Sequence, residues 1–176
     1  MRLILLSLTL IILPLIGMAQ VAEIDSKVFK FEFEQNFPGQ PDVIFDAATG
    51  DISGWWDHTF AENPIRLVIE PKPGGNFYEI FNEQGDGVVH ATVTGAQRGK
   101  FLRMEGPLGL AGRATHMVST YHFSELTSDS TKLKLEVHMA GEIDQKLAEV
   151  VQNVWRHFIV EQFTPYIEQG KHLQHK

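Results

Sequence analysis

The sequence contains no cysteine among its 176 residues. A disulfide framework, a thiolate metal site and lipid attachment at a cysteine are therefore excluded, and the fold must depend on its core alone. Positive charge is also scarce: 15 Lys and Arg stand against 22 Asp and Glu, for a formal net charge of −7 at pH 7. Nucleic acids and anionic membranes are bound through basic surfaces, so neither is predicted as the main partner.

Only one long apolar run is present, at residues 3–16, and it lies at the N-terminus. Arg2 precedes this run, and residues 17–19 (GMA) place small side chains at the two positions that a signal peptidase reads. The run is short for a membrane span, so residues 1–19 are predicted to be a signal peptide, with a retained N-terminal anchor as the alternative. We therefore expect a secreted or periplasmic protein without stable membrane insertion after the signal is removed.

The glycine patterns of nucleotide-binding loops and the GxSxG motif of serine hydrolases are absent, and no cofactor is predicted. A single domain is expected over residues 28–173, preceded by a short segment at 20–27. The eight histidines show no spacing typical of a zinc motif. His116, His122 and His138 are expected on the solvated face of one hairpin, so no metal site is predicted.

The clearest positive signal is the segment from Ile143 to Gln169, which has the period of an amphipathic helix. Pro165 is expected to kink or end this helix. The residues on its apolar face are Leu147, Val150, Val151, Val154, Trp155, Phe158 and Ile159. Because this face is wide, a broad apolar surface must lie against it.

Strand patterns fill most of the remaining chain. The alternation at 28–34 predicts a first strand, with Phe29, Phe31 and Phe33 facing the core. Prolines and glycines then favour two short helices, around residues 41–47 and 50–56. From residue 66 to 106, strand-like runs separated by Gly, Pro, Asn and Asp predict an antiparallel meander.

Two longer strands, 116–123 and 132–139, are predicted to form the last hairpin. A turn near Ser128 would place Phe123 opposite Leu133 on the buried face. The same register pairs Tyr121 with Leu135, Ser119 with Val137 and Met117 with Met139. The glycine-rich loop at residues 106–112 is expected to lie over a cleft. These elements predict an α+β domain with about six to seven antiparallel strands, two short helices after the first strand and a long C-terminal helix.

This order of elements, together with IEPKPGGNFYEIF (69–81), GVVHATV (87–93) and GKFLRMEGPLG (99–109), resembles the SRPBCC superfamily. Within that superfamily the chain looks most like the branch with the heat-shock-protein-90 ATPase activator-type and polyketide cyclase-like domains. The resemblance implies the helix-grip, or START-like, fold. In this fold a curved antiparallel sheet wraps around the C-terminal helix, and an apolar cavity lies between them.

Such a cavity would be lined by large apolar side chains from the sheet and the helix. The predicted ligand-binding residues are Trp55, Trp56, Phe77, Phe81, Met104, Met117, Tyr121, Val151, Trp155 and Phe158. Each could equally belong to a core packed at normal density, without space for a ligand. One indole of the Trp55–Trp56 pair is expected to close the cavity while the other lies at the surface, with capping of the core as the alternative.

Two polar residues are candidates for chemistry. Glu79 shares the strand parity of Phe77, so its carboxylate is predicted to face the cavity. If His90 on the neighbouring strand also faced inward, the two side chains could form an acid–base pair. However, Val89 and Val93 belong to the more apolar face of that strand, and burying that face would send His90 to solvent.

The leading hypothesis is a protein that binds a small hydrophobic or amphipathic ligand between sheet and helix. The first alternative is a cyclase- or hydrolase-type enzyme that uses Glu79, with or without His90. A chaperone-like interaction module, which would need a partner surface in place of a cavity, is the third.

Overall fold

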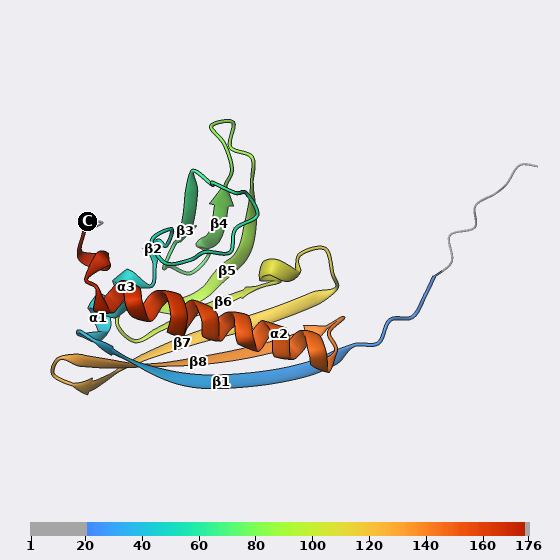
Figure 1. The fold of residues 1–176 in the computed structure, drawn as a ribbon. Coiled ribbons are helices and arrows are strands. Elements are labelled where there is room, and N and C mark those ends of the chain that lie inside the picture. Colours follow the sequence, from blue (N-terminus) through green and yellow to red (C-terminus); the bar gives the residue numbers. More distant parts are fainter. Residues whose placement is uncertain (1–20, 175–176) are drawn as a thin grey trace, which may run out of the picture.

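In the computed structural model, residues 21–174 are described, so the predicted signal peptide at 1–19 lies outside the described residues. One eight-stranded antiparallel sheet packs against a long C-terminal helix (Figure 1). The strand order is β1-β8-β7-β6-β5-β4-β3-β2: strands β2 to β8 form a meander, β1 pairs with β8, and the open sheet has β1 and β2 at its edges. The α+β architecture predicted from the sequence is confirmed, and it is consistent with a helix-grip fold.

The strands are β1 (Lys27–Pro38), β2 (Gly50–Asp51), β3 (Arg66–Ile69), β4 (Asn76–Ile80), β5 (Gly87–Gln97), β6 (Phe101–Gly106), β7 (Thr115–Thr127) and β8 (Ser130–Gly141). The helical elements are α1 (Pro41–Ala47), η1 (Leu108–Leu110), α2 (Gln145–Arg156), η2 (His157–Phe163), α3 (Thr164–Glu168) and η3 (Lys171–Leu173). In the described part of the chain, no helix is both long and apolar enough to cross a membrane.

The first predicted short helix is present as α1, but the second, around residues 50–56, is not. Gly50 has a φ of +73°, which a right-handed helix does not use. Gly50 and Asp51 instead pair with β3 as the two-residue strand β2, and turns follow. This short strand brings the sheet to eight strands, compared with the six to seven expected.

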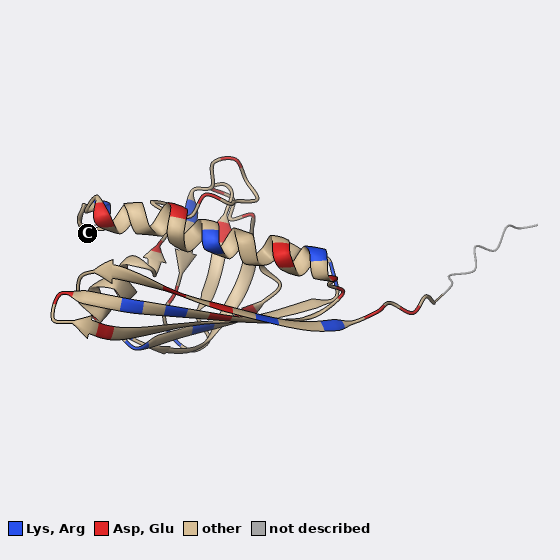
Figure 2. Cartoon of the chain, turned by 60° about the horizontal axis from the view of Figure 1, so that its bottom comes forward, with Lys and Arg blue, Asp and Glu red and all other residues tan. Residues whose placement is uncertain are grey.

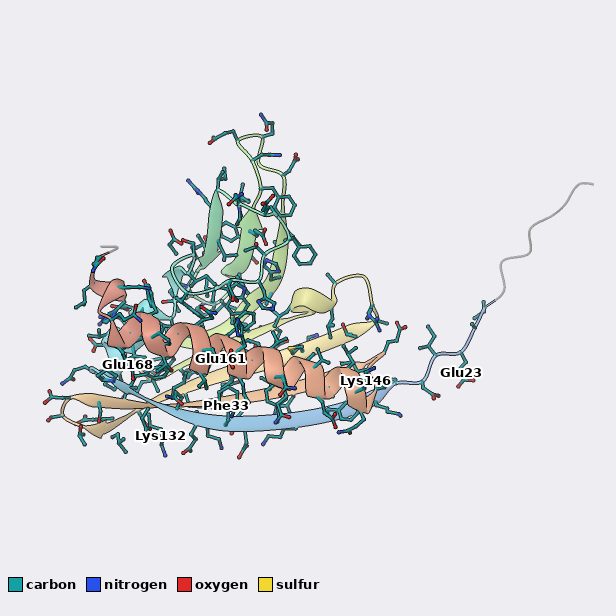
Figure 3. All side chains as sticks on the ribbon, in the orientation of Figure 1. Glu23, Phe33, Lys132, Lys146, Glu161 and Glu168 are labelled. Carbon is teal, nitrogen blue, oxygen red and sulfur yellow. The ribbon has the colours of Figure 1, made fainter. Side chains whose placement is uncertain are left out.

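The hairpin of β7 and β8 has the predicted register. Phe123 lies opposite Leu133 and Tyr121 opposite Leu135, and all four side chains are buried. The outer face of the same strands is solvated and charged, and Lys132 projects from it (Figure 3). Figure 2 shows acidic and basic residues interspersed along the long strands and the C-terminal helix.

Strand β5 is irregular at two places, and both bend the sheet. Its register with β4 shifts after Phe77, so that His90 is an extra residue and both His90 and Ala91 are buried. Its register with β6 shifts between Val93 and Gly95. Because bulges bend a strand and increase its twist, β3, β4 and β5 rise beside the helix and away from the plane of β1, β7 and β8 (Figure 1).

The C-terminal helix begins with a side-chain cap and continues through its proline. The carboxylate of Asp144 accepts a hydrogen bond of 2.7 Å from the amide of Leu147. Pro165 was expected to kink or end the helix, but the helix widens into the π-helical segment η2 just before it. There the hydroxyl of Thr164 donates to the carbonyl of Ile159 at 2.9 Å. These adjustments accommodate the missing proline amide, so the helix extends into α3.

The end of the interior near α3 is filled with aromatic side chains. The ring of Phe163 packs 5.1 Å from that of Phe37 and 4.7 Å from that of Trp55, measured between centroids. Gly54 lies so close to the helix that a Cβ there would stand 2.7 Å from the ring of Tyr166. This packed end fixes the position of the helix on the sheet.

Candidate ligand-binding cavity

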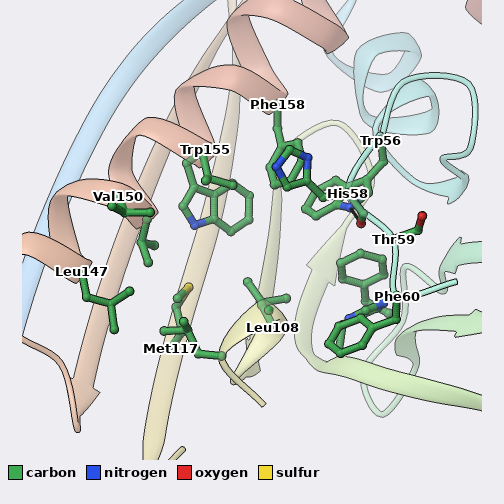
Figure 4. Close-up of a pocket in the computed structure, with 16 residues that line it drawn as sticks. Trp56, His58, Thr59, Phe60, Leu108, Met117, Leu147, Val150, Trp155 and Phe158 are labelled. Carbon is green, nitrogen blue, oxygen red and sulfur yellow. Dashed lines mark hydrogen bonds between the residues drawn. The ribbon is translucent and has the colours of Figure 1, made fainter. Parts of the chain in front are cut away.

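A cavity of about 520 Å³ lies beneath the N-terminal part of the C-terminal helix (Figure 4). Its walls come from the helix, from strands β4, β5 and β7, from the loop after Trp56, and from the loop that carries η1. Most of the lining side chains are apolar. A volume of this size lies within the range of roughly 300–1,000 Å³ found for small-molecule sites.

Six of the ten predicted ligand-binding residues line this cavity. They are Trp56, Phe77, Met117, Val151, Trp155 and Phe158. Trp56 and Phe158 stack with their ring centroids 3.8 Å apart, and the indole nitrogen of Trp56 donates to the carbonyl of His58 at 2.8 Å. These contacts fix one wall of the cavity.

The other four predicted residues lie elsewhere. Met104 and Tyr121 are fully buried in the core of the sheet, and Phe81 follows the end of β4 at the β4–β5 turn. Trp55 packs on Phe163 in the filled end of the interior, and its indole nitrogen donates to the carbonyl of Ala47 at 3.2 Å. The expectation that one indole of the pair lies at the surface was wrong, since both are buried.

Nine lining residues besides His90 were not among the predicted ligand-binding residues. They are His58, Thr59, Phe60, Leu108, Gly109, Leu110, Leu147, Val150 and Val154. The last three lie on the apolar helix face that the sequence pattern identified, and residues 108–110 lie in the glycine-rich loop expected over a cleft. Residues 58–60 carry no periodic signal, because an irregular loop reaches the cavity only through tertiary packing.

Glu79 is buried as its strand parity predicted, but it does not line the cavity. One carboxylate oxygen accepts from the amide of Ala61 at 2.7 Å, and the other accepts from the amide of Phe60 at 3.0 Å. Two backbone hydrogen bonds to one buried carboxylate fix the loop against β4. In this geometry Glu79 holds the loop that forms a wall of the cavity.

His90 lines the cavity, and its Nε2 lies 3.2 Å from the carboxylate of Glu79. The bulge in β5 turns it inward and leaves Val89 exposed, so the expected inward direction of Val89 was wrong. Burial lowers the pKa of His90 despite the opposing effect of Glu79. With Nε2–H donated to the carboxylate, a neutral ring keeps Nδ1 as an acceptor. Among the described residues, none bonds to that nitrogen.

Two apolar residues mark where the cavity reaches the surface. Phe60 and Val150 both line it, yet they are 57% and 49% exposed. We infer that the opening lies between the loop of Phe60 and helix α2.

The η1 loop forms another wall of the cavity. Its Leu108 has a φ of +50°, a conformation that a leucine adopts at a cost of about 1–3 kcal/mol.

A polar cluster lies beside the cavity and was not predicted from the sequence. Asp57 is 2.8 Å from Nδ1 of His58 and 2.7 Å from Nε2 of His157, and Nδ1 of His157 is 2.9 Å from Glu161. Hydrogen bonds donated by the ring to Glu161 and Asp57 raise the pKa of His157. Partial burial acts to raise the pKa of Asp57, but its two histidine partners outweigh this effect and lower it.

The histidines that the sequence analysis considered are separate from this cluster. His116, His122 and His138 are all exposed on the outer face of β7 and β8, as predicted. Their imidazoles lie on the side of the sheet opposite the helix. Among the described residues, the histidines that line the cavity are His58 and His90.

No protein-family model and no curated protein matches the chain. Solved structures do resemble it. Protein SA2116 of Staphylococcus aureus, of unknown function, aligns with a TM-score of 0.63 at 15% identity, covering 84% of this chain and 98% of its own. Protein NE0264 of Nitrosomonas europaea aligns at 0.58 and 15% identity, covering 81% and 96%. Protein Mll3558 of Rhizobium loti aligns at 0.58 and 16% identity, covering 77% and 94%. At these identities the likeness shows the fold alone.

Proposed function

We propose that this protein is an SRPBCC-type binding protein that holds a small hydrophobic or amphipathic ligand between its sheet and C-terminal helix. The observation that carries the proposal is the apolar cavity of about 520 Å³. A core packed at normal density holds few voids larger than a water molecule. If residues 1–19 are cleaved as a signal peptide, binding takes place outside the cytoplasm.

Affinity would come mainly from removing apolar ligand surface from water. Each 100 Å² of buried apolar surface contributes about 2.5 kcal/mol before the cost of association. Directional contacts are few, because the lining is mostly apolar. Nδ1 of His90 is the best placed acceptor, and it would orient a hydroxyl or a protonated carboxyl group of the ligand.

The half-exposed positions of Phe60 and Val150 support a ligand route into the cavity. Monomeric proteins tolerate single exposed apolar residues, but these two line one cavity from opposite walls. A ligand tail entering there would cover both side chains.

The test is displacement of cis-parinaric acid, a fluorescent fatty acid, from the purified protein. Val151→Trp places an indole in the cavity and should weaken binding at least tenfold. Val28→Trp is the matched control, since Val28 is 76% exposed and lies on β1, outside the cavity. Equal affinity of the two variants, or no saturable binding by the parent, would overturn the proposal. Native mass spectrometry of protein purified from its own compartment then identifies the natural ligand.

A cyclase- or hydrolase-type enzyme is the second candidate, favoured by the 3.2 Å contact between Glu79 and the cavity-lining His90. In that case Glu79 would set the protonation of His90, and His90 would move a proton on the bound ligand. Comparison of ligand extracts before and after incubation with the parent and with His90→Gln tests this candidate. A product formed by the parent alone would support an enzyme, whereas an unchanged ligand profile supports binding only.

A further inference from the structure

Beside the cavity, two histidines and an aspartate from distant parts of the chain meet. Asp57 and His58 come from the loop after β2, and His157 begins the π-helical segment η2. The side-chain nitrogen or oxygen atoms that these residues offer all lie within 4.8 Å of one another. We propose that Asp57, His58 and His157 form a binding site for a divalent transition-metal ion, with Zn²⁺ as the best match.

Packing of the cavity wall brings these three residues together. Trp56 stacks on Phe158 at 3.8 Å. The proposed ligands adjoin this pair in the chain: Asp57 and His58 follow Trp56, and His157 precedes Phe158. The ring of His58 packs edge-on against Phe158, with centroids 4.9 Å apart. Because Trp56 and Phe158 are both buried, their contact fixes the two backbones that carry the ligands. The site is therefore built by the wall and does not depend on long flexible side chains.

The donor set suits zinc. Two imidazole nitrogens and one carboxylate are three ligands that catalytic and other open zinc sites use, with a fourth position left for water or another molecule. Tetrahedral bonds of about 2.0–2.1 Å place ligand atoms about 3.3 Å apart. The present separations are 2.7 Å and 2.8 Å from Asp57 to the two rings. To admit the ion, the Asp57 carboxylate would move about half an ångström away from each ring, and the two ring nitrogens, which lie within 4.8 Å of each other, would approach to the same spacing of about 3.3 Å.

Glu161 supplies an independent indication, because it bonds the other nitrogen of His157. Its carboxylate lies 2.9 Å from Nδ1, one helical turn beyond His157, and leaves Nε2 directed at Asp57. Histidines that bind metals commonly donate their second ring nitrogen to a carboxylate in this way, which fixes the tautomer and the ring orientation. Glu161 lies midway along the C-terminal helix (Figure 3). π-helical segments such as η2 also occur frequently at functional sites.

The site would lie at the rim of the cavity. His58 lines the cavity, while 53% of its side chain remains exposed. An ion held there would have its open position near the entrance that Phe60 and Val150 mark. Metal binding itself requires no ligand in the cavity, so this inference stands or falls separately from the proposed function.

The test is calorimetric titration of the metal-stripped protein with Zn²⁺ alone at pH 8. We expect one ion per chain. Asp57→Asn, His58→Gln and His157→Gln should each weaken binding more than about 100-fold, and Glu161→Gln by about 10–100-fold. His116→Gln is the matched control, because His116 is an exposed histidine that pairs with Glu105 at 3.6 Å and, within residues 21–174, belongs to no group of three potential metal ligands. Circular dichroism confirms that each variant is folded.

Three results would overturn the site: no saturable binding by the parent, undiminished binding by the ligand variants, or equal weakening by His116→Gln. Glu161→Gln keeps the test valid if a ligand variant does not fold, since 68% of the Glu161 side chain is exposed. Binding of Co²⁺ provides a second readout. The parent should give the visible absorption of a cobalt ion with nitrogen and oxygen ligands, and His157→Gln should lose it.

Discussion

The two ends of the C-terminal helix carry the same amphipathic pattern but cover different interiors. Near α3, Phe163 is fully buried between Phe37 and Trp55. Along α2, the apolar face covers a cavity of about 520 Å³, and Val150 remains half-exposed. A wide apolar face therefore does not by itself imply a filled core. The segments opposite the helix decide whether an end of the interior is filled. α1 and the Trp55 turn fill one end, whereas the loop after Trp56 and the η1 loop leave space at the other.

The largest effect is expected from truncation at the filled end. Phe163→Ala removes a fully buried ring from a close-packed aromatic cluster and should cost about 3–5 kcal/mol of unfolding free energy. Urea denaturation measures this loss. A cost below 1 kcal/mol would mean that the two ends do not differ in packing.

Replacement of the carboxylate that holds the loop of Phe60 and Ala61 should have the next largest effect on stability. In Glu79→Gln, the carboxylate that accepts from the amides of Phe60 and Ala61 becomes an amide, and stability should fall by about 1.5–3 kcal/mol. Glu34→Gln is the control, because Glu34 lies on the outer face of β1 and is exposed. An equal stability loss in the two variants would contradict the anchoring role.

The pH dependence of stability should reveal the buried histidine of the cavity. Burial lowers the pKa of His90 below its usual 6.5, so the unfolded chain binds the proton more readily than the folded protein. The contribution of His90 to stability is therefore full above pH 6.5 and is lost as pH falls toward the folded pKa. His90→Gln should flatten the curve of unfolding free energy between pH 7 and 5, while His138→Gln, at an exposed site, should not. Parallel curves for all three proteins would refute this assignment.

The smallest effect is expected at the open end. Val150→Ala removes two methyl groups from a half-exposed side chain at the cavity rim, so stability should change by no more than about 0.5 kcal/mol. Urea denaturation of this variant and of Phe163→Ala compares the loss of unfolding free energy at the two ends directly. A loss of several kcal/mol at Val150 would show that α2 packs as tightly as α3.

Much of the fold could be predicted because it follows from local periodicity. The register of Phe123 with Leu133 depends only on alternation and on the position of one turn, and the structure has that register. The apolar face of the C-terminal helix was likewise defined by its spacing. The segment around residues 50–56 was misassigned, because a two-residue strand leaves no periodic signal and its pairing with β3 is a long-range contact.

The sequence by itself determined the α+β class, the hairpin register, the helix and the apolar character of the interior, since each depends on the order of side chains along one element. Tertiary structure alone decided the direction of His90, because a single extra residue in β5 reverses strand parity. It also decided that Glu79 binds loop amides and that Asp57 meets His157, which lies 100 residues away in the chain. The cavity has the same origin, because empty space depends on how far separate elements approach and no single segment encodes that distance.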